Sequence, residues 1–156
     1  MPASPWQWYV GGTRVKDGGA NMMVSTKGRY ALRLMIDIAK QGEVGSLVTM
    51  RQAAEREGLS VKYLEQLGGA LVKADVLKSV RGVSGGYLLA RPADEITVGD
   101  ILRATEGSSA PVACVEDSEH CERSSGCSAR EFWIGLDRAI ESYADSVKLS
   151  TLAKRP

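Results

Sequence analysis

The first well-patterned stretch of the chain repeats apolar residues with helical spacing. Between Thr26 and Lys40 they fall at positions i, i+3, i+4, i+7 and i+8, so they share one face of a helix. The residues on this face are Ala31, Leu34, Met35, Ile38 and Ala39. The pattern predicts an amphipathic helix with one buried side.

Two shorter helical patterns follow, with a tight connection between them. Thr49 and Gln52 have the spacing of a capping box, Gly58 is suited to end a helix, and Ser60 is suited to begin the next one. The inward positions of that next helix are Val61, Leu64, Leu67 and Leu71. The pair predicts a helix-turn-helix. The glycines at positions 68–69 each cost about 1 kcal/mol relative to Ala inside a helix, and close packing against a neighbour is the reason that the sequence suggests.

A β-hairpin is predicted next. Residues 76–80 and 87–90 are strand-like, and residues 82–86 are rich in glycine, as a turn requires. A helix pair followed by a hairpin is a winged helix-turn-helix. Thr97 then caps a further helix, and the inward positions of this helix are Val98, Ile101, Leu102 and Thr105.

Near the C-terminus, apolar residues are spaced alternately by four and three. The residues with this spacing are Ala129, Trp133, Leu136, Ile140, Tyr143 and Val147. This heptad pattern predicts a long helix whose seam, from Trp133 onward, pairs with a second copy of the chain. Packing of the seam onto the chain's own core is the alternative. The predicted fold is mainly α with a small β-hairpin wing (α+β), a winged helix-turn-helix plus a long C-terminal dimerisation helix.

Composition and charge narrow the function classes. The 156-residue chain has 44% hydrophobic and 25% charged residues, which is typical of a globular protein, and its net charge is +1. Five basic residues stand against two acidic ones between Ser60 and Arg91, and the balance is reversed between Cys114 and Glu131. A basic middle segment in a nearly neutral protein indicates one polyanion-binding face.

The sequence argues against a membrane-spanning protein, a secreted protein and an enzyme. No apolar run approaches the roughly 20 residues that span a bilayer, and residues 1–21 lack the pattern of a secretory signal and are expected to form a flexible N-terminal extension. Three cysteines without an export signal favour a cytoplasmic protein with free or metal-bound thiols. The chain has one histidine and no nucleophile elbow, phosphate loop or carboxylate pair beside a nucleophile, so we expect no enzymatic activity.

The second helix of the predicted pair carries a polar face suited to DNA. Its early exposed positions are Ser60, Lys62, Tyr63, Glu65 and Gln66. Gln can pair with adenine, Glu can accept from cytosine, and Lys and Ser can hold phosphates or bases. Arg81 adds a cation to the thin tip of the wing. A solvated helix and an ordinary hairpin explain each feature alone, but the ordered set predicts DNA binding.

All three cysteines lie in one acidic stretch, CVEDSEHCERSSGC at residues 114–127. Six residues separate Cys114 from Cys121, and five separate Cys121 from Cys127. Three thiolates on a loop can hold an iron–sulfur cluster, whereas a structural zinc site usually shows two closely spaced ligand pairs. Zinc, bare redox-active thiols and a chance grouping of thiols remain the alternatives.

Three segments resemble one bacterial family of transcriptional regulators, the IscR, NsrR and CymR type. They are residues 24–33 (VSTKGRYALR), 59–66 (LSVKYLEQ) and 79–89 (SVRGVSGGYLL). The resemblance implies a homodimer on a pseudo-palindromic DNA site, with the third helix in the major groove and the wing in the minor groove. The DNA-contacting residues that it implies are Thr26, Lys27, Arg29, Ser60, Lys62, Tyr63, Glu65, Gln66, Arg81, Ser84 and Gly85. The expected divisions are an extension at 1–21, a DNA-binding domain at 22–107, a cysteine-bearing cluster loop at 108–127, and a dimerisation helix and tail at 128–156.

The resemblance also bears on the cysteine loop. Members that carry a cluster have three cysteines in this loop, so it implies that Cys114, Cys121 and Cys127 are metal ligands, with 2Fe–2S as the expected cluster. The fourth ligand stays open: Arg130 stands where some members have a histidine, and Arg29 stands where others borrow an aspartate from the partner. The other candidates are His120, a loop carboxylate (Glu116, Asp117 or Glu119) and a residue of the other subunit. The alternative function is a cluster-free thiol-redox or CymR-like regulator of cysteine and sulfur metabolism, the CymR-like type acting with a metabolic enzyme. The operator, the signal, and repression as against activation stay open.

Overall fold

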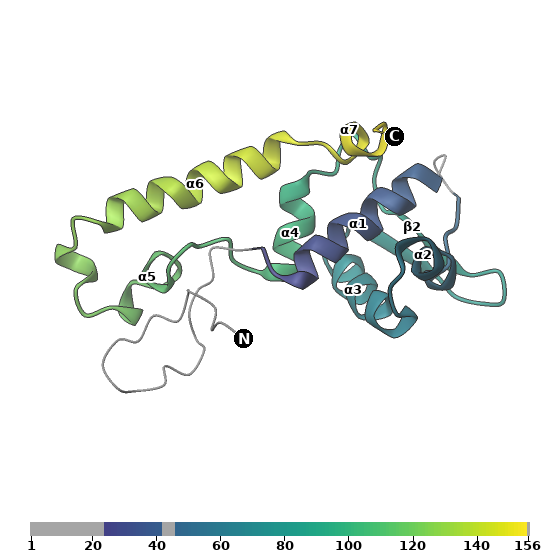
Figure 1. The fold of residues 1–156 in the computed structure, drawn as a ribbon, viewed down its shortest axis with the longest axis horizontal. Helices are drawn as coiled ribbons and strands as arrows, with labels where there is room; N and C mark the ends of the chain where they lie inside the picture. Colours follow the sequence, from purple (N-terminus) through teal and green to yellow (C-terminus); the bar gives the residue numbers. More distant parts are fainter. Residues whose placement is uncertain (1–23, 42–45, 156) are drawn as a thin grey trace, which may run out of the picture.

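The computed structural model describes residues 24–41 and 46–155, so the predicted extension at 1–21 lies outside the described residues. The elements are α1 (Thr26–Gln41), α2 (Met50–Glu57), α3 (Val61–Lys73), β1 (Leu77–Val80), β2 (Gly86–Leu89), α4 (Val98–Glu106), α5 (Ala113–Glu116), two 3₁₀ turns (Ser118–His120 and Ser124–Gly126), α6 (Arg130–Ser146) and α7 (Leu149–Ala153). The mainly helical fold with one small hairpin is confirmed (Figure 1).

The helix boundaries follow from local caps. The hydroxyl of Thr49 accepts from the amide of Gln52, and the Gln52 side chain accepts from the Thr49 amide, which completes the predicted capping box of α2. Gly58 ends α2 in the left-handed conformation (φ 66°). The Ser60 hydroxyl caps α3 by accepting from the amide of Tyr63, and Thr97 forms a second capping box with Asp100 at the start of α4. These caps fix the short helix-turn-helix connection that the sequence predicts.

The helix-turn-helix and the hairpin share one core with α1, α4 and α7. The residues of this core that are fully buried and large include Leu34, Met35, Ile38, Leu64, Leu71, Leu77, Ile96, Ile101 and Leu149. Gly68 of α3 allows close packing here, because a Cβ would lie 2.5 Å from Cε of Met50 and 3.2 Å from Cε1 of Tyr87. Gly69 is different: a Cβ there would meet nothing within 4 Å. The packing explanation therefore holds for Gly68 alone.

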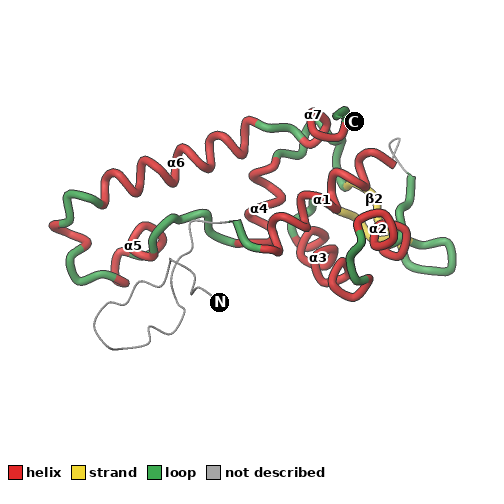
Figure 2. Tube along the Cα trace, in the orientation of Figure 1, coloured by secondary structure: helices red, strands yellow, loops and turns green. Residues whose placement is uncertain are grey.

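The wing is an antiparallel hairpin in which Leu77 pairs with Leu89 and Val80 pairs with Gly86. Two backbone hydrogen bonds of 2.8 Å between Val48 and Tyr87 hold its inner strand to the start of α2. The turn is tight at Gly85, where a Cβ would collide with the carbonyl of Val80. The hairpin is thus fixed at its base and extends beyond the helices as an exposed loop (Figure 2).

Helix α6 extends away from this body, and the segment with α5 lies at its far end (Figure 1). The heptad pattern runs past the helix, because Val147 is the C-cap of α6 and has extended backbone angles. The prediction that Val147 lies on the dimerisation helix is therefore wrong. Val147 and its neighbours instead pair with residues 93–98 through backbone hydrogen bonds of 2.9 to 3.0 Å, and α7 then packs against α1.

Candidate nucleic-acid interface and cysteine loop

The N-terminal half of α3 presents polar side chains to solvent. Lys62, Glu65 and Gln66 are exposed, as predicted for a face that meets DNA bases. The hydroxyl of Ser60 is exposed too, although its oxygen already accepts from the amide of Tyr63. The ring of Tyr63 is half-buried and packs edge-on against Tyr30 of α1, with centroids 6.0 Å apart. The contact with α1 thus fixes how α3 presents its polar face.

The tip of the wing is exposed from Arg81 to Ser84. Val83 is the most exposed of the large apolar residues in the described ranges, at 109%. Gly82 has a positive φ of 114° and Gly85 sits against backbone atoms, so these glycines are explained by the turn itself. A narrow tip with one cation, one hydroxyl and one apolar side chain has the size and chemistry to enter a DNA groove.

The first turn of α1 adds further polar residues. Thr26, Lys27 and Arg29 are all exposed on it. Behind this turn, the carboxylate of Glu106 accepts hydrogen bonds from the Gly28 amide (2.7 Å) and from the Ser25 hydroxyl (2.6 Å). Sequence reasoning missed Glu106, since it lies 78 positions after Gly28 and no local pattern connects the two residues.

The three cysteines lie in the segment between α4 and α6. Cys114 is in α5, Cys121 follows the first 3₁₀ turn and Cys127 follows the second. All three thiols are free; Cys114 and Cys121 are half-buried and Cys127 is exposed. Within the described residues, no group of three His, Cys, Asp or Glu side chains is placed to hold a metal ion. The side chain of His120, one of the candidates for a fourth ligand, lies outside the described part of the structure.

Two side-chain hydrogen bonds connect the cysteine segment to α6. The Nε of Arg130 donates to the carbonyl oxygen of Cys114 at 3.3 Å, and the hydroxyl of Ser109 donates to Asp137 at 2.9 Å. Arg130 occupies the position where the family resemblance places a histidine ligand in some members. In this chain the Arg130 side chain instead donates a hydrogen bond to the backbone of Cys114.

A charged cluster joins α4 to the C-terminal end of α6. Arg103 contacts both carboxylate oxygens of Asp145, at 2.7 and 3.2 Å, and also Asp100 at 3.3 Å. Arg91, just after the wing, contacts Asp100 from the other side at 3.3 Å. Burial raises the pKa of Asp100, but hydrogen bonds from Thr97 and Arg103 outweigh it and hold that pKa below its ordinary value. The wing, α4 and α6 thus meet at one set of ion pairs.

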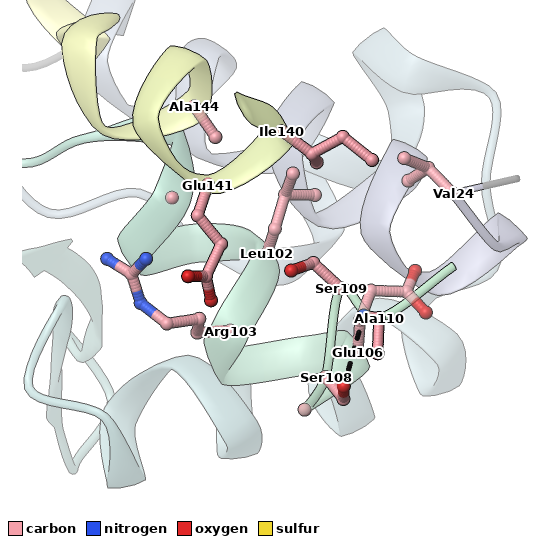
Figure 3. A pocket seen from close by; sticks show the side chains of 12 residues that line it. Val24, Leu102, Arg103, Glu106, Ser108, Ser109, Ala110, Ile140, Glu141 and Ala144 are labelled. Atoms are coloured by element: carbon pink, nitrogen blue, oxygen red, sulfur yellow. Dashed lines mark hydrogen bonds between the residues drawn. The ribbon is translucent and has the colours of Figure 1, made fainter. Parts of the chain in front are cut away.

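A cavity of about 130 Å³ lies beside this cluster, between α4, α6 and Val24, which is two residues before α1. In Figure 3, Leu102 and Ile140 line its apolar part, while Glu106 and Glu141 reach it from α4 and α6. Ile140, predicted to lie in the dimer seam, therefore also borders a space within its own chain. No local pattern in the sequence indicates this cavity, because it forms where the C-terminal part of α6 packs beside α4.

Helix α6 leaves two large aromatic side chains exposed, one near each of its ends. Phe132 is 63% exposed and Tyr143 is 74% exposed, whereas Trp133, Leu136 and Ile140 are half-buried. Phe132 and Trp133 pack edge to face, with centroids 4.9 Å apart. The predicted seam is therefore divided between two environments, and Phe132, absent from the prediction, belongs to its exposed part.

In the described ranges, no helix is both long enough and apolar enough to cross a membrane.

Comparison with known proteins identifies the group to which the chain is similar. It is 42% identical over 132 residues to the HTH-type transcriptional regulator CymR of Bacillus subtilis, covering 85% of this chain and 90% of that protein. It is 37% identical over 133 residues to the regulator IscR of Xenorhabdus nematophila, covering 85% and 80%. The solved oxidized form of Staphylococcus aureus CymR matches with a TM-score of 0.68 and 38% identity, covering 86% and 98%.

The relatives are named as transcriptional regulators, which agrees with the expectation that the chain is not an enzyme. Residues 24–155 match a family described as an iron-dependent transcriptional regulator. That match includes the helix-turn-helix, the wing, the cysteine segment and α6. The chain therefore belongs to the Rrf2 family of transcriptional regulators.

Proposed function

We propose that the chain binds double-stranded DNA as a homodimer, with α3 in the major groove and the wing in the minor groove. The observation that carries the proposal is the group of exposed polar side chains at the start of α3, Lys62, Glu65 and Gln66. Val61, predicted to point inward, is also exposed there, at 38%. Such side chains contact base edges and phosphates when a helix enters a groove. Arg81 and Ser84 of the wing supply minor-groove contacts, and Thr26, Lys27 and Arg29 supply phosphate contacts.

A second copy of the chain would cover the exposed face of α6. Phe132 and Tyr143 leave a large aromatic area in solvent, and pairing of two α6 helices would bury it. A two-fold dimer would set two α3 helices about 34 Å apart, which is one turn of DNA. The DNA site would then be a pseudo-palindrome.

We further propose that Cys114, Cys121 and Cys127 control DNA binding by holding an iron–sulfur cluster, with 2Fe–2S as the first candidate. The support is the presence of three thiols in one segment that leads directly into α6, together with the iron-dependent description of the family. The described side chains do not form a ready metal site, so ligation requires the segment between α4 and α6 to rearrange. Because this segment leads into α6, binding or loss of the cluster would change the position of α6.

Control by bare thiols is the second candidate, and one observation favours it. The CymR relative from Staphylococcus aureus was solved in an oxidized form. In this case, a change in thiol oxidation would alter the segment before α6 without a metal. The DNA-binding surface is the same in both candidates.

Anaerobic purification and reconstitution with iron and sulfide separates the two. The cluster proposal expects iron and sulfide in equal amounts and a visible chromophore that is lost in Cys114→Ala, Cys121→Ala and Cys127→Ala. Ser128→Ala, next to the last cysteine, is the matched control and should retain the chromophore. A colourless, iron-free protein whose DNA affinity changes with thiol oxidation would refute the cluster proposal and support the second candidate.

A further inference from the structure

Glu106 connects the end of α4 to the start of α1. It is the last residue of α4, and its Oε1 accepts from the Gly28 amide at 2.7 Å and from the Ser25 hydroxyl at 2.6 Å. Ser25 in turn accepts from the amide of Lys27 at 3.1 Å. One carboxylate therefore organises, directly or through Ser25, the backbone from which Lys27 and Arg29 extend.

The start of α1 has a physical need for this group. The first amides of a helix lack acceptors within the helix, and a negative charge near them is favourable. The first turn of α1 contains no acidic residue, so the charge comes from Glu106. Gly28 makes the contact geometrically accessible, because a Cβ at that position would collide with Oε1 of Glu106 and lie 2.8 Å from Cγ1 of Val24.

We propose that Glu106 is a positioning residue for DNA binding, which holds the first turn of α1 so that Lys27 and Arg29 meet the phosphate backbone. The inference rests on the proposed DNA-binding function. Glu106 also immediately precedes the segment that carries the three cysteines, and it borders the cavity between α4 and α6 (Figure 3). Movement of that segment therefore acts on the phosphate-contacting turn through this carboxylate.

The direction of the expected effect separates this role from simple electrostatics. Removing an acidic side chain from a DNA-binding protein ordinarily strengthens non-specific binding, because repulsion of the phosphates decreases. Removing Glu106 should weaken binding instead, since Lys27 and Arg29 lose their fixed positions. Glu141 provides the matched control: it is an exposed carboxylate on the opposite wall of the same cavity.

The experiment measures binding of the full-length chain to a labelled random-sequence duplex over a range of NaCl concentrations. Each protomer of the proposed dimer would lose two phosphate contacts, so the slope of log K against log salt becomes shallower by about 3.6 for the four contacts of the dimer. We expect this change in the double variant Lys27→Ala/Arg29→Ala and most of it in Glu106→Ala. Glu106→Gln, which keeps an acceptor oxygen, should recover part of the affinity, and Glu141→Ala should bind at least as tightly as the parent.

Amide hydrogen exchange gives a readout that does not depend on DNA. Glu106→Ala and Gly28→Ala should both accelerate exchange at residues 25–29 and leave the α3 amides unchanged. Unaltered exchange there, or a Glu106→Ala variant with the affinity and salt slope of Glu141→Ala, would overturn the positioning role. If the double variant itself binds as the parent does, the α1 phosphate contacts of the proposed function are wrong, and the inference falls with them.

Discussion

The adjacent glycines of α3 should respond in opposite directions to the same substitution. Ala is favoured over Gly inside a helix by about 0.8–1.0 kcal/mol. At Gly69 a Cβ meets nothing within 4 Å, so Gly69→Ala should stabilise the protein by about that amount. At Gly68 a Cβ lies 2.5 Å from the methyl of Met50 and 3.2 Å from the ring of Tyr87. Overpacking of this kind costs about 1–3 kcal/mol, so Gly68→Ala should be neutral or destabilising by up to about 2 kcal/mol.

The assay is urea unfolding followed by circular dichroism, with both variants at the same protein concentration because the proposed dimerisation would contribute to stability. The two unfolding midpoints should move apart by the equivalent of about 1–3 kcal/mol, with Gly69→Ala above the parent. Equal shifts in the two variants would refute the reasoning, since helix propensity alone predicts no difference. If Gly69→Ala is less stable than the parent, other atoms must pack against the α3 surface at Gly69.

Three further predictions test other parts of the molecule. Leu149→Ala, which removes a fully buried side chain, should destabilise the protein by about 2–5 kcal/mol in the same unfolding assay. The control Thr151→Ala, at an exposed position of α7, should have little effect. Equal effects of the two substitutions would place α7 outside the core. Arg81→Ala should weaken binding to a random-sequence duplex and make its salt dependence shallower, and an unchanged slope would remove the wing from the phosphate contacts. The pKa of Asp100 is lowered on folding, so its contribution to stability is present above the ordinary carboxyl pKa and is lost as pH falls below about 4. Asp100→Asn should therefore lose less stability than the parent as the pH falls, as measured by thermal unfolding. An unaltered pH profile of stability would contradict this role of Asp100.

The parts of the fold that were predictable are those with local causes. Thr49, Ser60 and Thr97 cap the helices that follow them, and Gly58 ends α2, because each interaction spans only a few residues. The exposed polar face of α3 follows from helical periodicity in the same way. A single sequence therefore located the helix-turn-helix and the wing to within a residue or two.

The parts that were missed depend on contacts between distant segments. The heptad spacing continues through Val147, but pairing of Val147 with Val98 ends α6 one residue earlier. The contact of Glu106 with Gly28 and the ion pair of Arg103 with Asp145 likewise have no signature in local spacing. The ligand role of the three cysteines stays a prediction; in the described part of the structure, short 3₁₀ turns separate the thiols along the segment.

Helix α6 meets the body at its C-terminal end, where Ala144 is buried, and carries the thiols beyond its opposite end. A helix of this length spans about 25 Å, so a shift of about 2 Å at the outer end corresponds to a rotation of only some 5° at the attached one. Such a lever would leave the proposed sensing chemistry free of the packing constraints of the core. Loops of other lengths and reactivities could be grafted onto the same tip, and the proposed DNA-binding body would serve each of them unchanged.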